Sequence, residues 1–297
     1  MTSLKLTTQS VKDLFDQTPL TPQRPVRSMW TRLAVMAPAF LVATAVGGGV
    51  RALAGTNPVL SLLFGVVVSV AGLALYAYLV RHLEQRPVTE LAPDDAKPSL
   101  SRGALLGLAL FTGTLFFVVL FGSYGTEGGV SVLGLITVFG AMLTPAVLEE
   151  LLFRAVAFRL LEERFGTRAA LIVSAVVFGG LHLVNPGATI WGALAIAIEG
   201  GLMLGAVYTA TRNIWLVIGI HFGWNFAESG IFGVTVSGAD DAQTGLLHGV
   251  LTGPEALTGG AFGPEAGLFA ILVCSIPTVF YLRSAARRGM LRTGRTS

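Results

Sequence analysis

Charged residues are scarce in this chain. Only 12% of its 297 residues are Asp, Glu, Lys or Arg, whereas 53% are hydrophobic, and the mean hydropathy is +0.72. This composition excludes a soluble globular domain and is typical of an integral membrane protein, whose partner is the lipid bilayer. The single cysteine, Cys274, excludes a disulfide framework or a cysteine-based metal site within one chain.

Motifs of metalloproteases and of repeat proteins are also missing. The sequence contains no His-Glu-x-x-His motif and no internal repeat. We therefore predict neither a bound metal nor another cofactor. The sequence pI is near 9.3, but the basic residues fall in loops, where membrane topology accounts for them, and no nucleic-acid partner is predicted.

Long apolar runs, in contrast, are abundant. They cover residues 30–52, 57–80, 103–122, 130–165, 168–184, 188–210, 214–233 and 262–282. About 20 apolar residues suffice for a helix to cross a bilayer. The chain is therefore predicted to be an all-α, polytopic membrane protein with about eight transmembrane helices. The fourth run exceeds one bilayer thickness, so its charged end is expected to project into the cytoplasm.

The distribution of basic residues predicts the topology. With both termini in the cytoplasm, nearly every Lys and Arg falls in or beside an inner segment, as the positive-inside rule requires. Those segments are 1–29, 81–102, 159–168, 211–213 and the tail after 282. The excess of Arg over Lys and the abundance of Gly favour a bacterial source, and therefore a multi-pass protein of the bacterial cytoplasmic membrane.

The runs divide the chain into five parts. They are a flexible cytoplasmic tail (1–29), three N-terminal transmembrane helices (30–129), a membrane core that carries the polar motifs (130–233), an external loop (234–261), and a last transmembrane helix with a basic tail (262–297). The first 29 residues lack the short apolar core that follows the charges of a cleavable signal peptide.

Three ionisable residues interrupt the fourth run. Glu149, Glu150 and Arg154 lie close together in sequence, and a charge at bilayer depth costs roughly 3 kcal/mol on insertion scales. Glu150 and Arg154 are four residues apart on one helical face, so they are expected to pair. Glu149 lies about 100° around the helix from Glu150 and lacks such a partner. It could exchange protons near neutrality, although these three residues alone are equally compatible with a structural role.

Two further polar motifs lie within apolar runs. Phe178 and His182 share a helical face on the fifth run, and His221 and Asn225 share one on the seventh. Taken alone, each motif favours a hydrogen bond between helices over a contact with substrate.

The predicted depth of these residues in the membrane favours a functional role over a structural one. If the fourth and fifth helices form a hairpin that turns at 166–167, Glu149 and His182 both lie about 22–26 Å from the turn, at ~1.5 Å per residue. Asn225 falls near the same layer. A carboxylate, two imidazoles and a carboxamide at similar depth indicate one water-filled site, for which catalysis is favoured over a structural role.

The three motifs together resemble a known family. Glu149-Glu150-x-x-x-Arg154, Phe178-x-x-x-His182 and His221-x-x-x-Asn225 are similar to the motifs of the CAAX prenyl endopeptidase and bacteriocin-processing (CPBP) family, also called ABI-domain proteins. These are intramembrane glutamic proteases. The resemblance covers about 130–233, and no key position departs from the family pattern.

The resemblance implies an activity and a set of residue roles. The activity would be hydrolysis of peptide bonds in membrane-associated or lipid-linked peptides or in membrane proteins. The implied roles are a general base (Glu149), a residue that helps to hold and activate the attacking water (His182), an oxyanion hole (His221 and Asn225), a supporting ion pair (Glu150 and Arg154) and an aromatic ring beneath the histidine (Phe178).

Other functions remain open from the sequence. One Glu and two His from three helices could bind zinc and give a zinc-dependent variant of the protease. The chain could instead be a non-catalytic membrane scaffold, immunity or regulatory protein of the same fold, or a transporter with a proton site at the membrane midplane. The role of Glu199 in the sixth run is open, and Glu228, near the outer end of the seventh, is expected at the membrane interface.

Overall fold

The computed structural model describes residues 27–239 and 245–294. Most of the predicted N-terminal tail (1–29) and the last three residues lie outside this described part.

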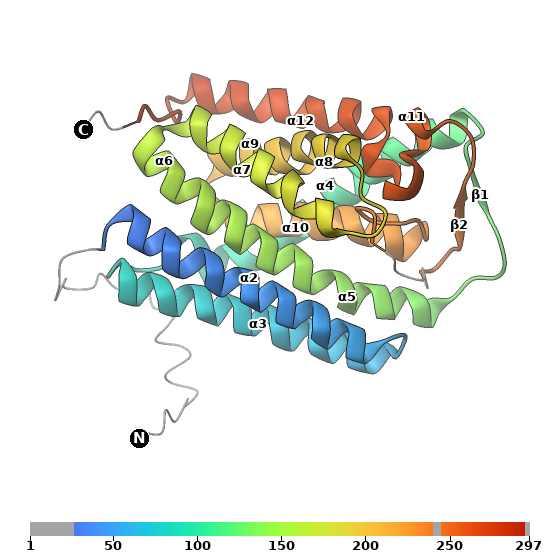
Figure 1. The fold of residues 1–297 in the computed structure, drawn as a ribbon, viewed down its shortest axis with the longest axis horizontal. Helices are drawn as coiled ribbons and strands as arrows, with labels where there is room; N and C mark the ends of the chain where they lie inside the picture. Colours follow the sequence, from blue (N-terminus) through green and yellow to red (C-terminus); the bar gives the residue numbers. More distant parts are fainter. Residues whose placement is uncertain (1–26, 240–244, 295–297) are drawn as a thin grey trace.

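Helices dominate the architecture (Figure 1). In chain order they are α2 (Met29–Ala54), α3 (Pro58–Leu83), α4 (Pro93–Leu120), α5 (Val132–Glu150), α6 (Arg159–Phe165), α7 (Thr167–Leu181), α8 (Ile190–Ile196), α9 (Met203–Thr211), α10 (Ile214–Asn225), α11 (Glu255–Thr258) and α12 (Leu268–Arg287). Single-turn 3₁₀ helices are η1 (Thr89–Leu91), η3 (His182–Val184), η6 (Gly260–Phe262) and η7 (Pro264–Ala266). The short strands β1 (Tyr124–Thr126) and β2 (Gly249–Leu251) pair antiparallel, with Gly125 opposite Val250.

Three π-helical segments continue or join the core helices. They are η2 (Leu151–Phe158) between α5 and α6, η4 (Ala197–Leu202) between α8 and α9, and η5 (Phe226–Ile231) after α10. A π-turn widens the helix by one residue and is uncommon, and it occurs most often at functional sites.

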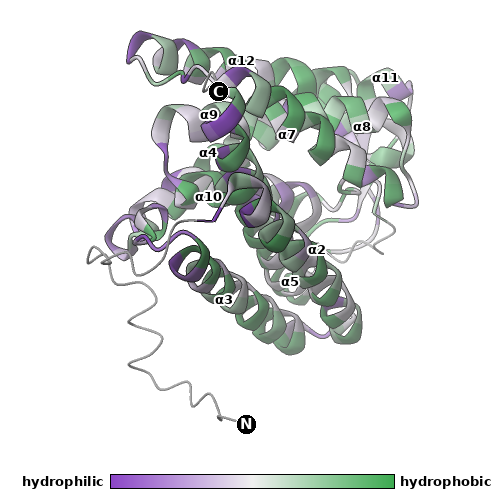
Figure 2. Cartoon of the chain, turned by 60° about the vertical axis from the view of Figure 1, so that its left-hand side comes forward, coloured by the Kyte–Doolittle hydropathy of each residue, from purple (hydrophilic) through white to green (hydrophobic). Residues whose placement is uncertain are grey.

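The prediction of an all-α polytopic membrane protein is confirmed. Among the described residues, seven helical segments are long and apolar enough to cross a bilayer. They correspond to seven of the eight predicted spans. The remaining run, 214–233, forms α10 and η5, and its content of His221, Asn225 and Glu228 makes it less apolar than the others. Figure 2 shows hydrophobic residues along the outer helices, with hydrophilic residues gathered mainly at helix ends and connections.

Capping residues set several helix boundaries. Asn57 accepts hydrogen bonds from the amides of Val59 and Leu60, and Pro58 occupies the first helical position of α3. Asn213 caps α10 in the same way through the amide of Leu216. The predicted hairpin turn at 166–167 is present, because Gly166 adopts a φ of 83° between α6 and α7, a conformation that glycine tolerates.

Close packing of backbones places α10 against α4. A Cβ atom added at Gly107 on α4 would lie 2.0 Å from the carbonyl oxygen of Ile220, and one added at Gly223 on α10 would lie 2.1 Å from that of Ala104. Only glycine permits this approach, as in other helix pairs within membranes. The contact holds α10, which carries His221 and Asn225, inside the bundle.

Ion pairs join the helix ends on the predicted cytoplasmic side. Arg159 pairs with Glu84 at 2.6 Å and with Glu163 at 3.1 Å, which connects α6 to the end of α3. Arg86 pairs with Glu90 at 2.7 Å in the following loop. Burial alone would raise the pKa of Glu90, but the hydrogen bond and the charge of Arg86 lower it to about 2.

Candidate active site

Glu150 connects two of the sequence motifs. Its Oε1 atom lies 2.7 Å from Nη1 of Arg154 and 2.8 Å from Nδ1 of His221, and the side chain has no solvent exposure. Pairing with Arg154 is as predicted. The contact with His221, which comes from α10, could not be predicted from helical spacing because the two residues are 71 positions apart.

Arg154 extends the same network to a third helix. Its Nη2 atom donates to the carbonyl oxygens of Gly200 (2.8 Å) and Gly201 (3.2 Å) in η4, and its guanidinium carbon lies 4.9 Å from the centre of the Phe178 ring. The π-helical turn of η4 alters the usual backbone pairing there, and Arg154 supplies a donor to both carbonyls. Arg154 therefore holds the fourth, fifth and sixth predicted spans together.

His182 sits where α7 ends and η3 begins. Its Nδ1 atom lies 2.8 Å from the carbonyl oxygen of Phe178, and the two ring centroids are 4.8 Å apart. Because a carbonyl oxygen can only accept, Nδ1 must carry the hydrogen, which leaves Nε2 as an acceptor in the neutral ring. The predicted packing of Phe178 against His182 is present.

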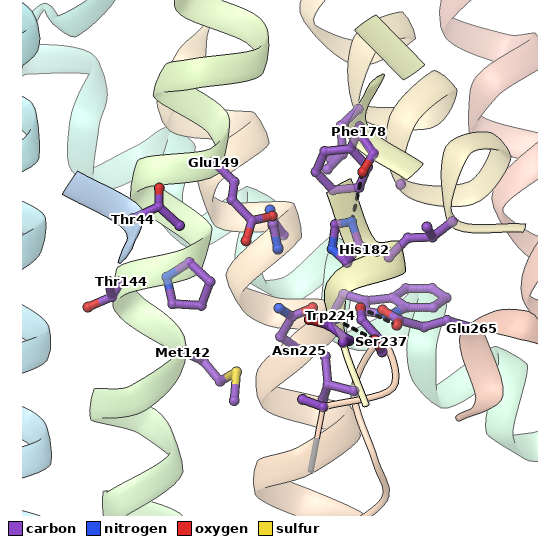
Figure 3. A pocket seen from close by; sticks show the side chains of 18 of the residues that line it. Thr44, Met142, Thr144, Glu149, Phe178, His182, Trp224, Asn225, Ser237 and Glu265 are labelled. Atoms are coloured by element: carbon purple, nitrogen blue, oxygen red, sulfur yellow. Dashed lines mark hydrogen bonds between the residues drawn. The ribbon is translucent and has the colours of Figure 1, made fainter. Parts of the chain in front are cut away.

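A cavity of about 300 Å³ brings the predicted residues together. Glu149, His182, His221 and Asn225 all line it, from α5, the end of α7 and α10. Figure 3 shows Glu149, His182 and Asn225 directed towards the same space from their separate helices. Among the described residues, no hydrogen-bond partner is found for the Glu149 carboxylate or the Asn225 carboxamide, so both groups are available to a water molecule or a substrate.

Of the π-helical segments among the described residues, η4 lines the cavity, whereas η2 and η5 begin next to residues that line it. Glu149 and Glu150 immediately precede η2, which contains Arg154; η4 contains Glu199 and the two carbonyls bound by Arg154. Asn225 immediately precedes η5. Glu150, Arg154 and Asn225 therefore lie in or next to a local change in helical pitch, where the direction of a side chain departs from regular α-helical spacing.

Several cavity residues were not anticipated from the sequence. Ser237 lies near the start of the predicted external loop 234–261, whose first residues fold back to line the cavity. Glu265 lies in η7, at the start of the run 262–282 that was predicted as the last membrane helix. The last transmembrane helix begins at Leu268 rather than near 262, because 260–266 forms the short turns η6 and η7. From α2, Thr44 and Arg51 also line the cavity. No motif spacing marks any of these positions.

Two further carboxylates, those of Glu199 and Glu228, are buried in the protein. Glu199, whose role the sequence left open, lines the cavity and is 3% exposed. The prediction that Glu228 lies at the membrane interface is wrong, because this residue is fully buried. The loop after η5 folds back over it, as shown by the hydrogen bond from the amide of Val234 to the carbonyl oxygen of Glu228.

The described side chains do not form a recognisable metal site. No three His, Cys, Asp or Glu residues within 27–239 and 245–294 are arranged as a group that could hold a metal ion. The zinc-dependent alternative thus has no ligand set in the described part of the chain.

The fold and the site define a polytopic α-helical membrane protein with a cavity among its helices that is largely apolar and carries a few ionisable and polar side chains. Residues 130–227 match the family model of Rce1-like type II CAAX prenyl endopeptidases. This match confirms the resemblance of the membrane core to the CPBP family and supports a CAAX-type protease in general terms. No curated protein and no solved structure matches the chain.

Proposed function

We propose that this protein is an intramembrane endopeptidase that hydrolyses peptide bonds of membrane-associated or lipid-linked peptides. The observation that best supports the proposal is the convergence of three separate motifs on one cavity, connected through the contacts of Glu150 with Arg154 and His221. Peptide hydrolysis by water needs a base, a positioned water molecule and donors aimed at the developing oxyanion. The cavity wall offers a group for each task.

Glu149 is the proposed general base. Its carboxylate lines the cavity without a partner among the described residues, so it is free to accept a proton from water. His182 would orient that water through Nε2, since its Nδ1 is occupied by the carbonyl oxygen of Phe178. The water oxygen then attacks the carbonyl carbon, and the proton held by Glu149 passes to the leaving nitrogen as the C–N bond breaks.

His221 and Asn225 are the proposed oxyanion donors. Nδ1 of His221 faces Glu150, so only a protonated ring can also donate from Nε2 towards the cavity. The carboxylate of Glu150 stabilises that positive charge at a distance of 2.8 Å. The Asn225 carboxamide supplies a second donor from the next turn of α10.

The test compares newly formed peptide termini in membranes that contain wild-type or Glu149→Gln protein at matched expression. Gln preserves the size of the side chain but cannot act as a base. Glu127→Gln, which neutralises an exposed carboxylate outside the cavity, is the matched control. We expect one set of termini in wild-type and Glu127→Gln membranes that is missing with Glu149→Gln.

Identical termini in all three membranes would count against a protease. His182→Ala and Asn225→Ala extend the comparison, since both lie on the cavity wall. If neither changes the termini, a non-catalytic binding role for this cavity would be the better account.

A further inference from the structure

The cavity lies in one half of the helical bundle. Gly48 near the end of α2, Asn185 after η3 and Ser237 after η5 all line it. Among the described residues, none that lines it belongs to a connection on the predicted cytoplasmic side or to the tail after α12. The cavity is therefore displaced towards the end of the bundle that carries β1, β2 and α11, opposite to α6 and the C-terminus (Figure 1).

Buried apolar side chains close the cavity towards the cytoplasmic end. Met203, Leu204 and Ile220 line it there and are at most 3% exposed. Met203 and Leu204 lie roughly 11–12 Å from the end of α9 at Thr211, at ~1.5 Å per residue. About two turns of packed helix thus separate the cavity from the inner end of α9.

Further contacts fill the space below these residues. The rings of Phe158 and Tyr208, both buried, pack edge to face with centroids 5.7 Å apart. At the inner end, Arg212 pairs with the buried carboxylate of Glu162 at 2.5 Å, which joins α6 to the turn before α10. A peptide approaching Glu149 from the cytoplasmic side would have to break these contacts.

The opposite end of the cavity reaches the molecular surface. Gly48 is exposed, and a Cβ atom added there would meet nothing within 4 Å. Asn185 is partly exposed, and Trp191, a few residues later in the chain, is 54% exposed. Exposed tryptophans gather where lipid headgroups meet water. The mouth of the cavity therefore lies near a membrane interface.

The basic residues indicate which interface this is. Lys and Arg are absent from the connections at the mouth end, which are 55–57, 121–131, 185–189 and 232–267. The other end carries Arg81, Arg86, Lys97, Arg102, Arg164, Arg168, Arg212, Arg283, Arg287 and Arg288. Because cytoplasmic segments collect the basic residues of a membrane protein, the mouth faces away from the cytoplasm.

We infer that the cavity opens on the extracytoplasmic face of the membrane and that its substrate is a peptide or membrane-protein segment presented from that side. This inference rests on the proposed function, because it defines which peptide bonds can reach Glu149. A peptide tail in the cytoplasm, with or without a lipid, would face the closed inner end. The substrates are therefore extracytoplasmic.

The experiment measures access to the cavity without turnover. The full-length protein carries Cys274→Ala, which removes the buried native thiol, and one new cysteine. Gly48→Cys and Ser237→Cys place that thiol at the mouth and on the cavity wall. Glu127→Cys and Lys97→Cys are matched controls at exposed positions of the two ends. Each variant that elutes as folded protein in size-exclusion chromatography is assayed in right-side-out and in inside-out membrane vesicles.

The probe is a quaternary-ammonium methanethiosulfonate, whose permanent charge hinders its passage through the apolar core of a bilayer. We expect the thiols at positions 48, 127 and 237 to react at least about tenfold faster in right-side-out vesicles, and the thiol at position 97 to show the reverse. Reaction of position 48 or 237 mainly in inside-out vesicles would overturn the inference. Exchange of the two control patterns would do so as well, and unreactive cavity positions in both vesicles would indicate entry from within the bilayer.

The position of the cleaved bonds gives a second readout that needs no cysteine variant. The peptide termini that are present in wild-type membranes and missing with Glu149→Gln should lie in extracytoplasmic segments, and termini in cytoplasmic segments would overturn the inference. The two proposals can fail separately. Labelling from outside, together with identical termini in wild-type and Glu149→Gln membranes, would retain the extracytoplasmic opening and reject the protease.

Discussion

Glu150 offers the most decisive single perturbation. It has no solvent exposure and accepts hydrogen bonds from two cationic or potentially cationic groups, Arg154 and His221. Glu150→Gln preserves the shape but removes the charge that compensates Arg154. The Gln carbonyl oxygen can keep the contacts of Oε1, but the amide nitrogen then takes the position of Oε2, which is buried and has no hydrogen-bond partner among the described residues.

The expected loss is large because the pair is buried. Removing one partner of a buried ion pair costs about 3–5 kcal/mol, since the other charge is left uncompensated. Glu163→Gln is the matched control. Glu163 pairs with Arg32 and Arg159, but its side chain is 30% exposed. Exposed and half-exposed pairs contribute about 0–1 kcal/mol, so the control should unfold close to wild type.

A double substitution separates charge from shape. Glu150→Leu with Arg154→Met removes both charges, and apolar replacements of buried pairs are often close to neutral. The carbonyl oxygens of Gly200 and Gly201 lose their donor, which should cost about 1–3 kcal/mol. The double variant should therefore be more stable than Glu150→Gln and yet inactive, because His221 has lost its carboxylate partner.

Guanidinium-induced unfolding in detergent micelles measures these differences, and release of peptide termini measures activity. A Glu150→Gln variant whose free energy of unfolding lies within about 1 kcal/mol of wild type would contradict a stabilising buried ion pair at this position. A double variant no more stable than the single one would contradict it equally.

Three further predictions follow from the same contacts. Asn225→Ala should lower kcat about 10²–10³-fold with little change in folding, as loss of one oxyanion donor does, and a rate within threefold of wild type would contradict its proposed role. Gly107→Ala should destabilise the protein and reduce activity, because the added carbon would lie 2.0 Å from the Ile220 carbonyl oxygen. Gly113→Ala on the same helix, where a Cβ meets nothing within 4 Å, should do neither. Glu90→Gln should lower the unfolding midpoint at neutral pH. Because the folded pKa of about 2 lies below the ordinary 4.5, the stabilisation by Glu90 is present above pH 4.5 and disappears as pH falls towards 2. A wild-type-to-variant difference independent of pH would refute this account.

Periodicity and spacing predicted much of the fold and the cavity. Apolar runs located the membrane helices because a bilayer requires a fixed length of apolar chain. The i, i+4 rule placed Glu150 with Arg154 and Phe178 with His182, and both contacts are present. Equal depth below a shared turn placed Glu149 near His182, and the two line one cavity. All of these inferences depend on local helical geometry or on one hairpin.

The features that the sequence did not predict involve residues that are far apart in the chain or segments of irregular backbone. The hydrogen bond between Glu150 and His221 requires the rotation of α10 relative to α5, which glycine packing against α4 fixes. Glu265 reaches the cavity from the short turn η7, within the run 262–282 that apolar composition predicted to be a continuous membrane helix. Glu228 lies near a helix end, where an acidic side chain is usually exposed at the membrane interface. The loop after η5 covers this residue instead.

In the proposed mechanism, the charges of Glu149, Glu150, Arg154, His221 and the reaction intermediate balance at every stage. Before reaction, the carboxylates of Glu149 and Glu150 offset the cations of Arg154 and a protonated His221, so the net charge is zero. When Glu149 takes the proton from water, it loses its negative charge at the moment that the tetrahedral oxyanion gains one. The net charge of these groups and the intermediate therefore stays at zero through the step. Only the position of the negative charge changes, from Glu149 on the α5 side of the cavity towards His221 and Asn225. Because His221 and Asn225 already face the position that the negative charge will take, they need no large rearrangement. Electrostatic stabilisation of a transition state is most effective under this condition.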